Sequence, residues 1–256
     1  MILAVRALAW REFLRFFRQP HRVVGSLAQP LLMWVLLGSG FGASFRAPGL
    51  EGVSYAEYFY PGVLLMLALF SGIFATITII EDRNQGLLQE VLVAPVPRLA
   101  IVLGKVIGAT GVTLAQCLVL VAASPFLGLW PGWGGAALLL LGLVIATLGF
   151  TALGVVIAWN MESTAGFHAV MSVFLLPMWM LSGALFPLDQ APAWLWWTMI
   201  LNPATHALAI IRIPLAAHAG SWVQTPYLWA MTAAVVWALL CLLVAALQVN
   251  RVPKGR

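Results

Sequence analysis

Charged residues are scarce in this chain, and their scarcity excludes most classes of water-soluble protein. Asp, Glu, Lys and Arg make up 8% of the 256 residues, whereas soluble domains carry about 25%. Hydrophobic residues make up 62%, and the mean hydropathy is +0.99. One core of this size cannot hide so much apolar surface from water. The composition therefore predicts an integral membrane protein.

The alternation of apolar and polar residues that marks membrane β-strands is also missing. Long apolar runs predict helices instead, because a helix needs about 20 apolar residues to cross the hydrocarbon core. We predict an all-α membrane protein with six membrane-spanning helices, at residues 23–44, 58–80, 104–127, 135–158, 167–187 and 227–249.

Acidic residues are absent from the middle of every predicted span, and only Lys105 and His168 lie inside the ends. Ion-coupled pumps and transporters usually hold a charged residue within the membrane. The sequence therefore disfavours an ion-coupled secondary transporter, which stays an alternative. Cys117 and Cys241 fall in apolar runs and are expected to be packing residues.

Residues spaced for catalysis or metal binding are lacking too. His168, His206 and His218 are dispersed along the chain, so we expect no metal site. Glu162 and His168 are the only acid–base candidates, and no partner motif accompanies them. We expect no catalytic residue in this chain.

Basic residues are present and are divided unequally between the two sides of the membrane. Eleven of the 13 fall on the side that holds both termini, and only Arg46 and Arg212 fall on the other. The positive-inside rule then places both termini and the loop 81–103 in the cytoplasm. The net charge of +5 is explained by this topology, so no nucleic-acid partner is expected.

Residues 2–18 predict an amphipathic helix before the first span. Arg11, Arg15 and Arg18 share one side of it through their spacing, aromatic residues occupy the other side, and Pro20 ends it. Such a helix is expected to lie flat in the inner leaflet, in contact with membrane lipid. It is either a simple anchor or a lever that connects the spans to a cytoplasmic partner.

The stretch "EDRNQGLLQEVLVAPVPR", residues 81–98, gathers five charged side chains in an otherwise apolar chain. Its apolar residues form a short helical stripe after Gly86, and Pro95 and Pro97 end it. A helix of two to three turns is unstable alone in water. Either the membrane surface or a socket in a partner protein holds it; in the second case the charges form contact surface.

Residues 188–226 contain two apolar pieces, 191–201 and 204–217, that are too short to span the membrane and are broken by prolines. They are expected to be re-entrant or interfacial helices on the outer side. Arg212 is expected to reach toward lipid headgroups.

Two motif sets resemble those of ABC-2 type ABC-transporter permeases, in particular the branch of drug-resistance and nodulation-factor exporters. The first set is Asp82-Arg83, Gly86, Leu92-Val93-Ala94-Pro95 and Gly104-Lys105. The second set is Ser182-Gly183, Phe186-Pro187, Asn202-Pro203 and Arg212. With the six spans and the N-terminal helix, the resemblance covers essentially the whole chain.

The resemblance implies one transmembrane domain over residues 1–256 that pairs with a second permease chain, as a homodimer or a heterodimer, and with two copies of a separate ATP-binding subunit. ATP and Mg²⁺ would be bound by that subunit and by no group of this chain. Gly104-Lys105 is no P-loop, because Leu99 and Val106 replace its glycine and its Ser/Thr. A prokaryotic cell (inner) membrane location follows from the same resemblance.

The resemblance also implies roles for particular segments. The segment 1–22 would be a connecting helix, with Arg11, Arg15 and Arg18. The loop 81–100 would couple to the ATPase through Glu81, Asp82, Arg83, Gly86, Leu87, Leu88, Glu90, Val91, Leu92 and Pro95. A translocation cavity would include Phe70, Phe74, Phe174 and Met178. The exit side would include Pro187, Asn202, Pro203 and Arg212.

The expected function is export of an amphipathic, lipid-linked or glycan-like substrate, or of a drug, by alternating access driven by ATP. A non-catalytic subunit of another membrane complex is the second alternative.

Overall fold

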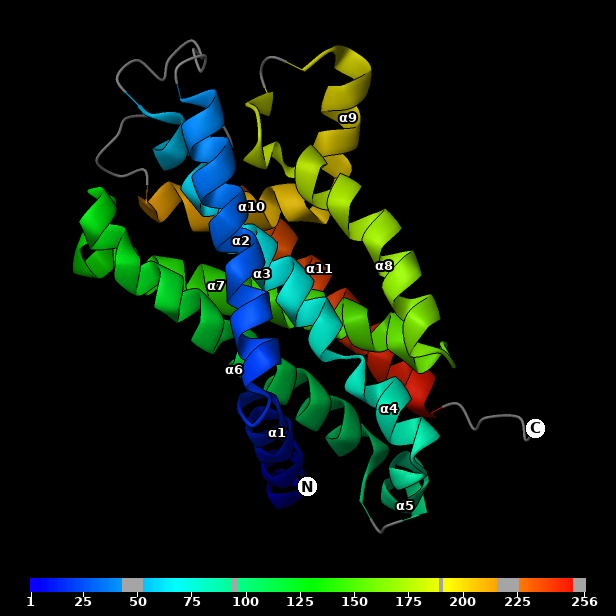
Figure 1. The fold of residues 1–256 in the computed structure, drawn as a ribbon. Helices are drawn as coiled ribbons and strands as arrows, with labels where there is room; N and C mark the ends of the chain where they lie inside the picture. Colours follow the sequence, from blue (N-terminus) through cyan, green and yellow to red (C-terminus); the bar gives the residue numbers. More distant parts are fainter. Residues whose placement is uncertain (43–52, 94–95, 189–190, 216–225, 251–256) are drawn as a thin grey trace.

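A computed structural model describes residues 1–42, 53–93, 96–188, 191–215 and 226–250 of the chain. These residues form helices joined by short connections, and no strand occurs among them. In chain order (Figure 1) the helices are α1 (Ile2–Phe17), α2 (Pro20–Phe41), α3 (Tyr55–Ala75), α4 (Thr78–Asn84), α5 (Leu87–Val93), α6 (Arg98–Ala123), η1 (Ser124–Leu127), α7 (Gly132–Trp159), α8 (Thr164–Trp179), η2 (Met180–Ala184), α9 (Ala193–Leu201), α10 (Pro203–Leu215) and α11 (Tyr227–Asn250).

Six helical stretches are long and apolar enough to cross a membrane: Pro20–Phe41, Tyr55–Asn84, Arg98–Leu127, Gly132–Trp159, Thr164–Ala184 and Tyr227–Asn250. Each overlaps one of the six predicted spans, so the all-α class and the span count are confirmed. The first span begins three residues earlier than predicted, because Pro20 stands at the start of α2, where its missing N–H is not needed.

The second span, α3, forms the centre of the bundle. Its residues from Tyr58 to Leu69 are all buried, and it packs against α2, α6, α7, α8 and α10. A helix that is apolar all round is typically enclosed by others, as here. By contrast, α2, α8 and α11 keep wide apolar surfaces exposed, as expected of helices that contact lipid.

The short elements gather at two ends of the bundle. In Figure 1, α1, α4 and α5 lie at the bottom and α9 at the top. Helix α10 lies across the bundle, buried against α7, α11 and α3. Both α9 and α10 are too short to span a membrane. That the segment 188–226 is re-entrant or interfacial stays a prediction; its residues 189–190 and 216–225 lie outside the described residues.

Candidate coupling site

Helix α4 extends the second span, and α5 folds back against it. Between them Gly86 has a φ of +78°, in the left-handed region that non-glycine residues rarely adopt. No neighbouring atom restricts this position, so the backbone conformation alone explains the glycine. The turn at Gly86 makes α4 and α5 a compact knob at one end of the molecule (Figure 1).

The apolar stripe of α5 is directed partly toward the chain itself. Leu88 is buried in the main hydrophobic cluster, and Val91 packs against that cluster. The exposed side of α5 carries Gln89, Glu90 and Val93, and Val93 is 87% exposed. The prediction that Leu88 belongs to a docking surface is therefore corrected: Leu88 packs into the helical bundle of this chain. Leu87 is half-buried; the side chain of Leu92 and residue Pro95 lie outside the described part.

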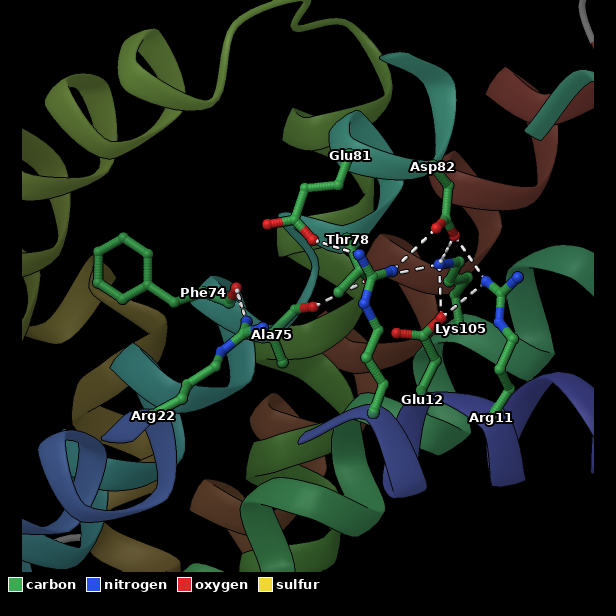
Figure 2. A network of polar contacts seen from close by, with 10 residues as sticks. Arg11, Glu12, Arg22, Phe74, Ala75, Thr78, Glu81, Asp82 and Lys105 are labelled. Carbon is green, nitrogen blue, oxygen red and sulfur yellow. Dashed lines mark hydrogen bonds and ion pairs between the residues drawn. The ribbon is translucent and has the colours of Figure 1, made fainter. Parts of the chain in front are cut away.

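Buried charges connect three helices beneath this knob (Figure 2). Lys105 of α6 donates a hydrogen bond of 2.6 Å to Glu12 of α1, one of 3.3 Å to the hydroxyl of Thr78, and another to Asp82 of α4. The Asp82 side chain is 2% exposed, and those of Glu12 and Lys105 are each 6% exposed. This inner cluster therefore joins α1, α4 and α6.

Two arginines of α1 form the half-exposed rim of the cluster. Arg11 reaches Asp82 at 2.6 Å and Glu12 at 3.0 Å. Arg15 reaches Asp82 at 2.9 Å and Glu81 at 2.7 Å. Three cations thus face three anions. The name "charge cluster" is used below for these six residues: Arg11, Glu12, Arg15, Glu81, Asp82 and Lys105.

The ionised form of Glu12 is stabilised inside the protein. Burial by itself would raise the pKa of Glu12, but the charge of Lys105 and hydrogen bonds from Lys105 and Arg11 outweigh burial and lower this pKa below its ordinary value. A buried ion pair that loses one partner leaves an uncompensated charge in a poorly hydrated site. The charge cluster therefore holds the three helices in one specific arrangement.

Helix α1 can approach α6 closely because α6 has glycines on the contacting side. A Cβ atom at Gly104 would lie 2.6 Å from the Cβ of Leu8, and one at Gly108 would lie 2.8 Å from the Cβ of Glu12. Glycines four residues apart are typical of tight helix contacts in membranes. This close approach brings Glu12 to Lys105.

The arginines of α1 were expected to share one side of the helix. Arg11 and Arg15 do point the same way, inward to the acidic residues of α4. Arg18 lies exposed near the end of α1. Whether α1 lies flat in the interface stays a prediction.

Arg83 also makes contacts within the chain. Its guanidinium donates to the carbonyl oxygens of Trp159 at 2.6 Å and of Met161 at 2.8 Å, and it lies 5.6 Å from the centre of the Trp159 ring. Arg83 therefore fastens α4 to the end of α7. Among the predicted charged coupling residues, Glu90 is the one that lies exposed, whereas Glu81 and Arg83 are half-buried and Asp82 is buried.

The predicted cavity residues do not come together in one site. Phe70 and Phe74 of α3 have ring centres 6.3 Å apart, and Phe74 stacks on His168 of α8 at 4.9 Å. Phe174 is 66% exposed on the outside of α8, and Met178 is half-buried. Phe174 points away from the core of a single chain.

Asn202, one of the predicted exit-side residues, is buried between the start of α10 and the end of α8. Asn202 accepts a hydrogen bond from the Ala204 N–H at 3.0 Å and donates one to the Met178 carbonyl at 2.6 Å. Pro203 begins α10, and Pro187 is half-buried. These contacts fix the start of α10 against the end of α8.

Arg212 is 6% exposed and does not reach toward headgroups, which corrects the prediction for it. It donates a 3.0 Å hydrogen bond to the Gly183 carbonyl and lies 4.4 Å from the centre of the Tyr58 ring. The same carbonyl accepts a hydrogen bond from Tyr58 at 2.8 Å. The Gly183 carbonyl therefore accepts two side-chain hydrogen bonds, which hold Arg212 inside the bundle.

Replacing Arg212 with methionine should lower the free energy of unfolding by about 2 kcal/mol, because a charged hydrogen bond and a cation–π contact are lost together. Thermal unfolding of the purified chain in detergent measures the effect. Arg212→Lys keeps the charge but not the planar guanidinium, and should fall between Arg212→Met and the native chain. Equal stability of all three proteins would contradict the assigned contacts.

The sequence profile of a family described as "ABC-2 type transporter" matches residues 4–215. The chain is 30% identical over 228 residues to "transport permease ycf38" of Cyanophora paradoxa, covering 88% of this chain and 78% of that protein. It is 29% identical over 193 residues to "Nodulation protein J" of Rhizobium leguminosarum bv. viciae, covering 74% of this chain and 73% of that protein.

A third similar protein is "Probable multidrug ABC transporter permease YbhR" of Escherichia coli. The identity is 26% over 165 residues, covering 62% of this chain and 44% of that protein. The named relatives are permeases or a nodulation protein, and the similarity to the first two extends over most of this chain.

Proposed function

Because the chain belongs to the ABC-2 type transporter family, we propose that it is the membrane-spanning subunit of an ATP-driven exporter. Membership makes it a multi-pass membrane permease, and permeases of this family work in general with an ABC ATPase. The further points proposed here are export, two permease chains with two ATPase subunits, and a cell membrane location with both termini in the cytoplasm.

The observation that carries the proposal is the mechanical connection between α5 and the spans. The exposed side of α5 offers Glu90, Gln89 and Val93 to a partner. Its buried side, through Leu88, packs into the bundle. Directly behind it, Asp82 is tied to both α1 and α6 by buried ion pairs. A force on α5 would therefore reach α1 and the second and third spans together.

In the proposed cycle the ATPase subunits bind ATP and Mg²⁺, and this chain binds neither. Closure of the two ATPases would push the α4–α5 knob of each permease chain. The charge cluster would carry that displacement to α1 and α6, and the two bundles would tilt between inward-open and outward-open states. Such switching needs only that ATP favours one of two packed arrangements.

For the substrate we propose an amphipathic, lipid-linked or glycan-like molecule, or a drug. The name of the multidrug relative supports a drug within this range. Phe174 offers an exposed apolar surface on the outside of α8, and Phe70 and Phe74 form a separate aromatic pair on α3. Phe174 of each chain would line a path at the contact between two permease chains.

The test is association with the ATPase. Glu90→Lys and Val93→Asp should each reduce, by more than tenfold, the amount of ATP-binding subunit that co-purifies with the tagged chain, because removing a charge or an apolar contact at an interface centre typically costs 2 kcal/mol or more. Glu162→Lys is the matched control: it makes the same exchange at an exposed position in the connection between α7 and α8, and should retain association.

Leu88→Asp serves as a second comparison. Because Leu88 is buried, this variant should lose thermal stability, whereas Glu90→Lys should unfold like the native chain. The proposal is wrong if no ATP-binding protein accompanies the native chain from its own membrane, or if Glu90→Lys and Val93→Asp retain it.

A further inference from the structure

A groove of about 870 Å³ runs between α1 and α6, on the side of α1 away from the charge cluster. Its wall on α6 is formed by Leu103, Ile107 and Gly111, which stand on successive turns. Its wall on α1 includes the aromatic side chains of Trp10 and Phe13. Known ligand sites have volumes of about 300–1,000 Å³, so the groove can hold a molecule of that size.

The two walls run in the same direction. Leu8 contacts Gly104, Glu12 contacts Gly108, and Phe13 approaches Gly111, so both helices progress together along the groove. From Leu103 to Gly111 the groove is about 12 Å long, at 1.5 Å per residue. One end lies near the start of the third span, and the other lies deeper along that span.

Charge is confined to one end of the groove. Among the residues that line it, Arg6 has the one charged side chain, and the amino group of Met1 adds a second positive charge at the same end, near Leu103. Arg11 and Arg15 are neutralised by acidic residues behind α1, whereas Arg6 forms no ion pair with any residue that the structure describes. The groove thus combines an uncompensated cation with an apolar channel.

We propose that this groove binds one anionic phospholipid, with its phosphate at Arg6 and an acyl chain along Trp10, Ile107 and Phe13. An arginine at one end complements the headgroup charge. The apolar length complements a chain, which a free phosphate would leave exposed to water. A bound lipid would fill the open space between α1 and α6 and so hold the two helices together.

The site is tested on the purified full-length chain alone, so its failure does not depend on the proposed ATPase or substrate. The chain is prepared in detergent with equal amounts of phosphatidylglycerol and phosphatidylcholine, and retained lipids are counted by native mass spectrometry. We expect one phosphatidylglycerol per chain, retained roughly fivefold better than phosphatidylcholine, because one arginine at a lipid surface contributes about that factor. Raised salt should reduce the preference.

Arg6→Gln should bring the ratio of retained phosphatidylglycerol to retained phosphatidylcholine close to one. Arg18→Gln is the matched control, since Arg18 is another exposed arginine at the opposite end of α1 and does not line the groove; it should keep the preference. Ile107→Trp, which fills the groove without changing charge, should lower retention of both lipids at this site. Equal retention of the two lipids by the native chain, or an equal effect of Arg6→Gln and Arg18→Gln, overturns the proposal.

Discussion

Replacing Lys105 with methionine should lower the free energy of unfolding of this chain by about 3–5 kcal/mol, the usual consequence of removing one partner from a buried ion pair. Methionine fills most of the space of lysine but supplies no charge. Glu12 and Asp82, both buried, would then face each other across the vacated position with one compensating cation fewer. Thermal and denaturant unfolding in detergent, with helix content as the signal, measure the loss.

A compensating change separates the charge effect from a packing effect. In the double variant Lys105→Met, Glu12→Gln, Arg11 and Arg15 remain balanced by Glu81 and Asp82. This protein should recover most of the lost stability, because a buried pair replaced as a unit is often nearly neutral. The loss of unfolding free energy in the double variant is compared with the losses in Lys105→Met alone and Glu12→Gln alone. If the double variant loses as much as the two single variants added together, Lys105 and Glu12 do not act as a pair.

The spans were predictable because the membrane imposes one strong requirement. Every backbone polar group must be satisfied within the hydrocarbon region, so long apolar runs become helices whatever their neighbours. Pro20 fixed the boundary between the N-terminal helix and the first span through its missing N–H. Both effects depend only on residues that are close together in the chain, so both can be predicted from the sequence.

The charge cluster was not predicted, because it depends on contacts between distant residues. Glu12 and Lys105 are 93 positions apart, and Arg11 and Asp82 are 71 positions apart. A signal was nevertheless present: Glu12 is the one acidic residue among the arginines of α1, four residues from both Leu8 and Phe16 on one helical face. The pair Gly104 and Gly108 marks the surface of α6 that this face contacts.

The orientation of α5 shows the same distinction between what the local sequence pattern predicts and what contacts with distant residues decide. The periodicity of the apolar stripe predicted a short amphipathic helix near Leu88, and the structure has one at Leu87–Val93. Periodicity identifies the apolar side of a helix but not what covers it. Here much of that side is covered by the bundle, so the surface left for a partner is formed by the polar residues Gln89 and Glu90 together with Val93.

Replacing Gly108 with alanine should destabilise the chain by about 3–5 kcal/mol, although alanine normally favours helix formation. The new Cβ would lie 2.8 Å from the Cβ of Glu12, 3.0 Å from the Ala9 carbonyl oxygen and 3.1 Å from the Ala9 Cα. Backbone atoms cannot rotate aside, so α1 must move away from α6. That movement lengthens the contact of Glu12 with Lys105 and leaves buried charge poorly paired, which adds to the 1–3 kcal/mol typical of overpacking.

Gly111→Ala provides the matched control for this prediction. It makes the same exchange in the same helix, but its Cβ would meet only the Phe13 ring, at an ordinary 3.9 Å. Its stability should therefore equal or exceed that of the native chain. Spin labels at positions 10 and 107, both exposed, report the separation of α1 from α6 directly: Gly108→Ala should reduce their dipolar coupling and Gly111→Ala should not. Unchanged coupling and stability in Gly108→Ala would mean that the close contact of α1 with α6 is absent from the protein in solution, and with it the connection from α5 to α1 on which the coupling mechanism depends.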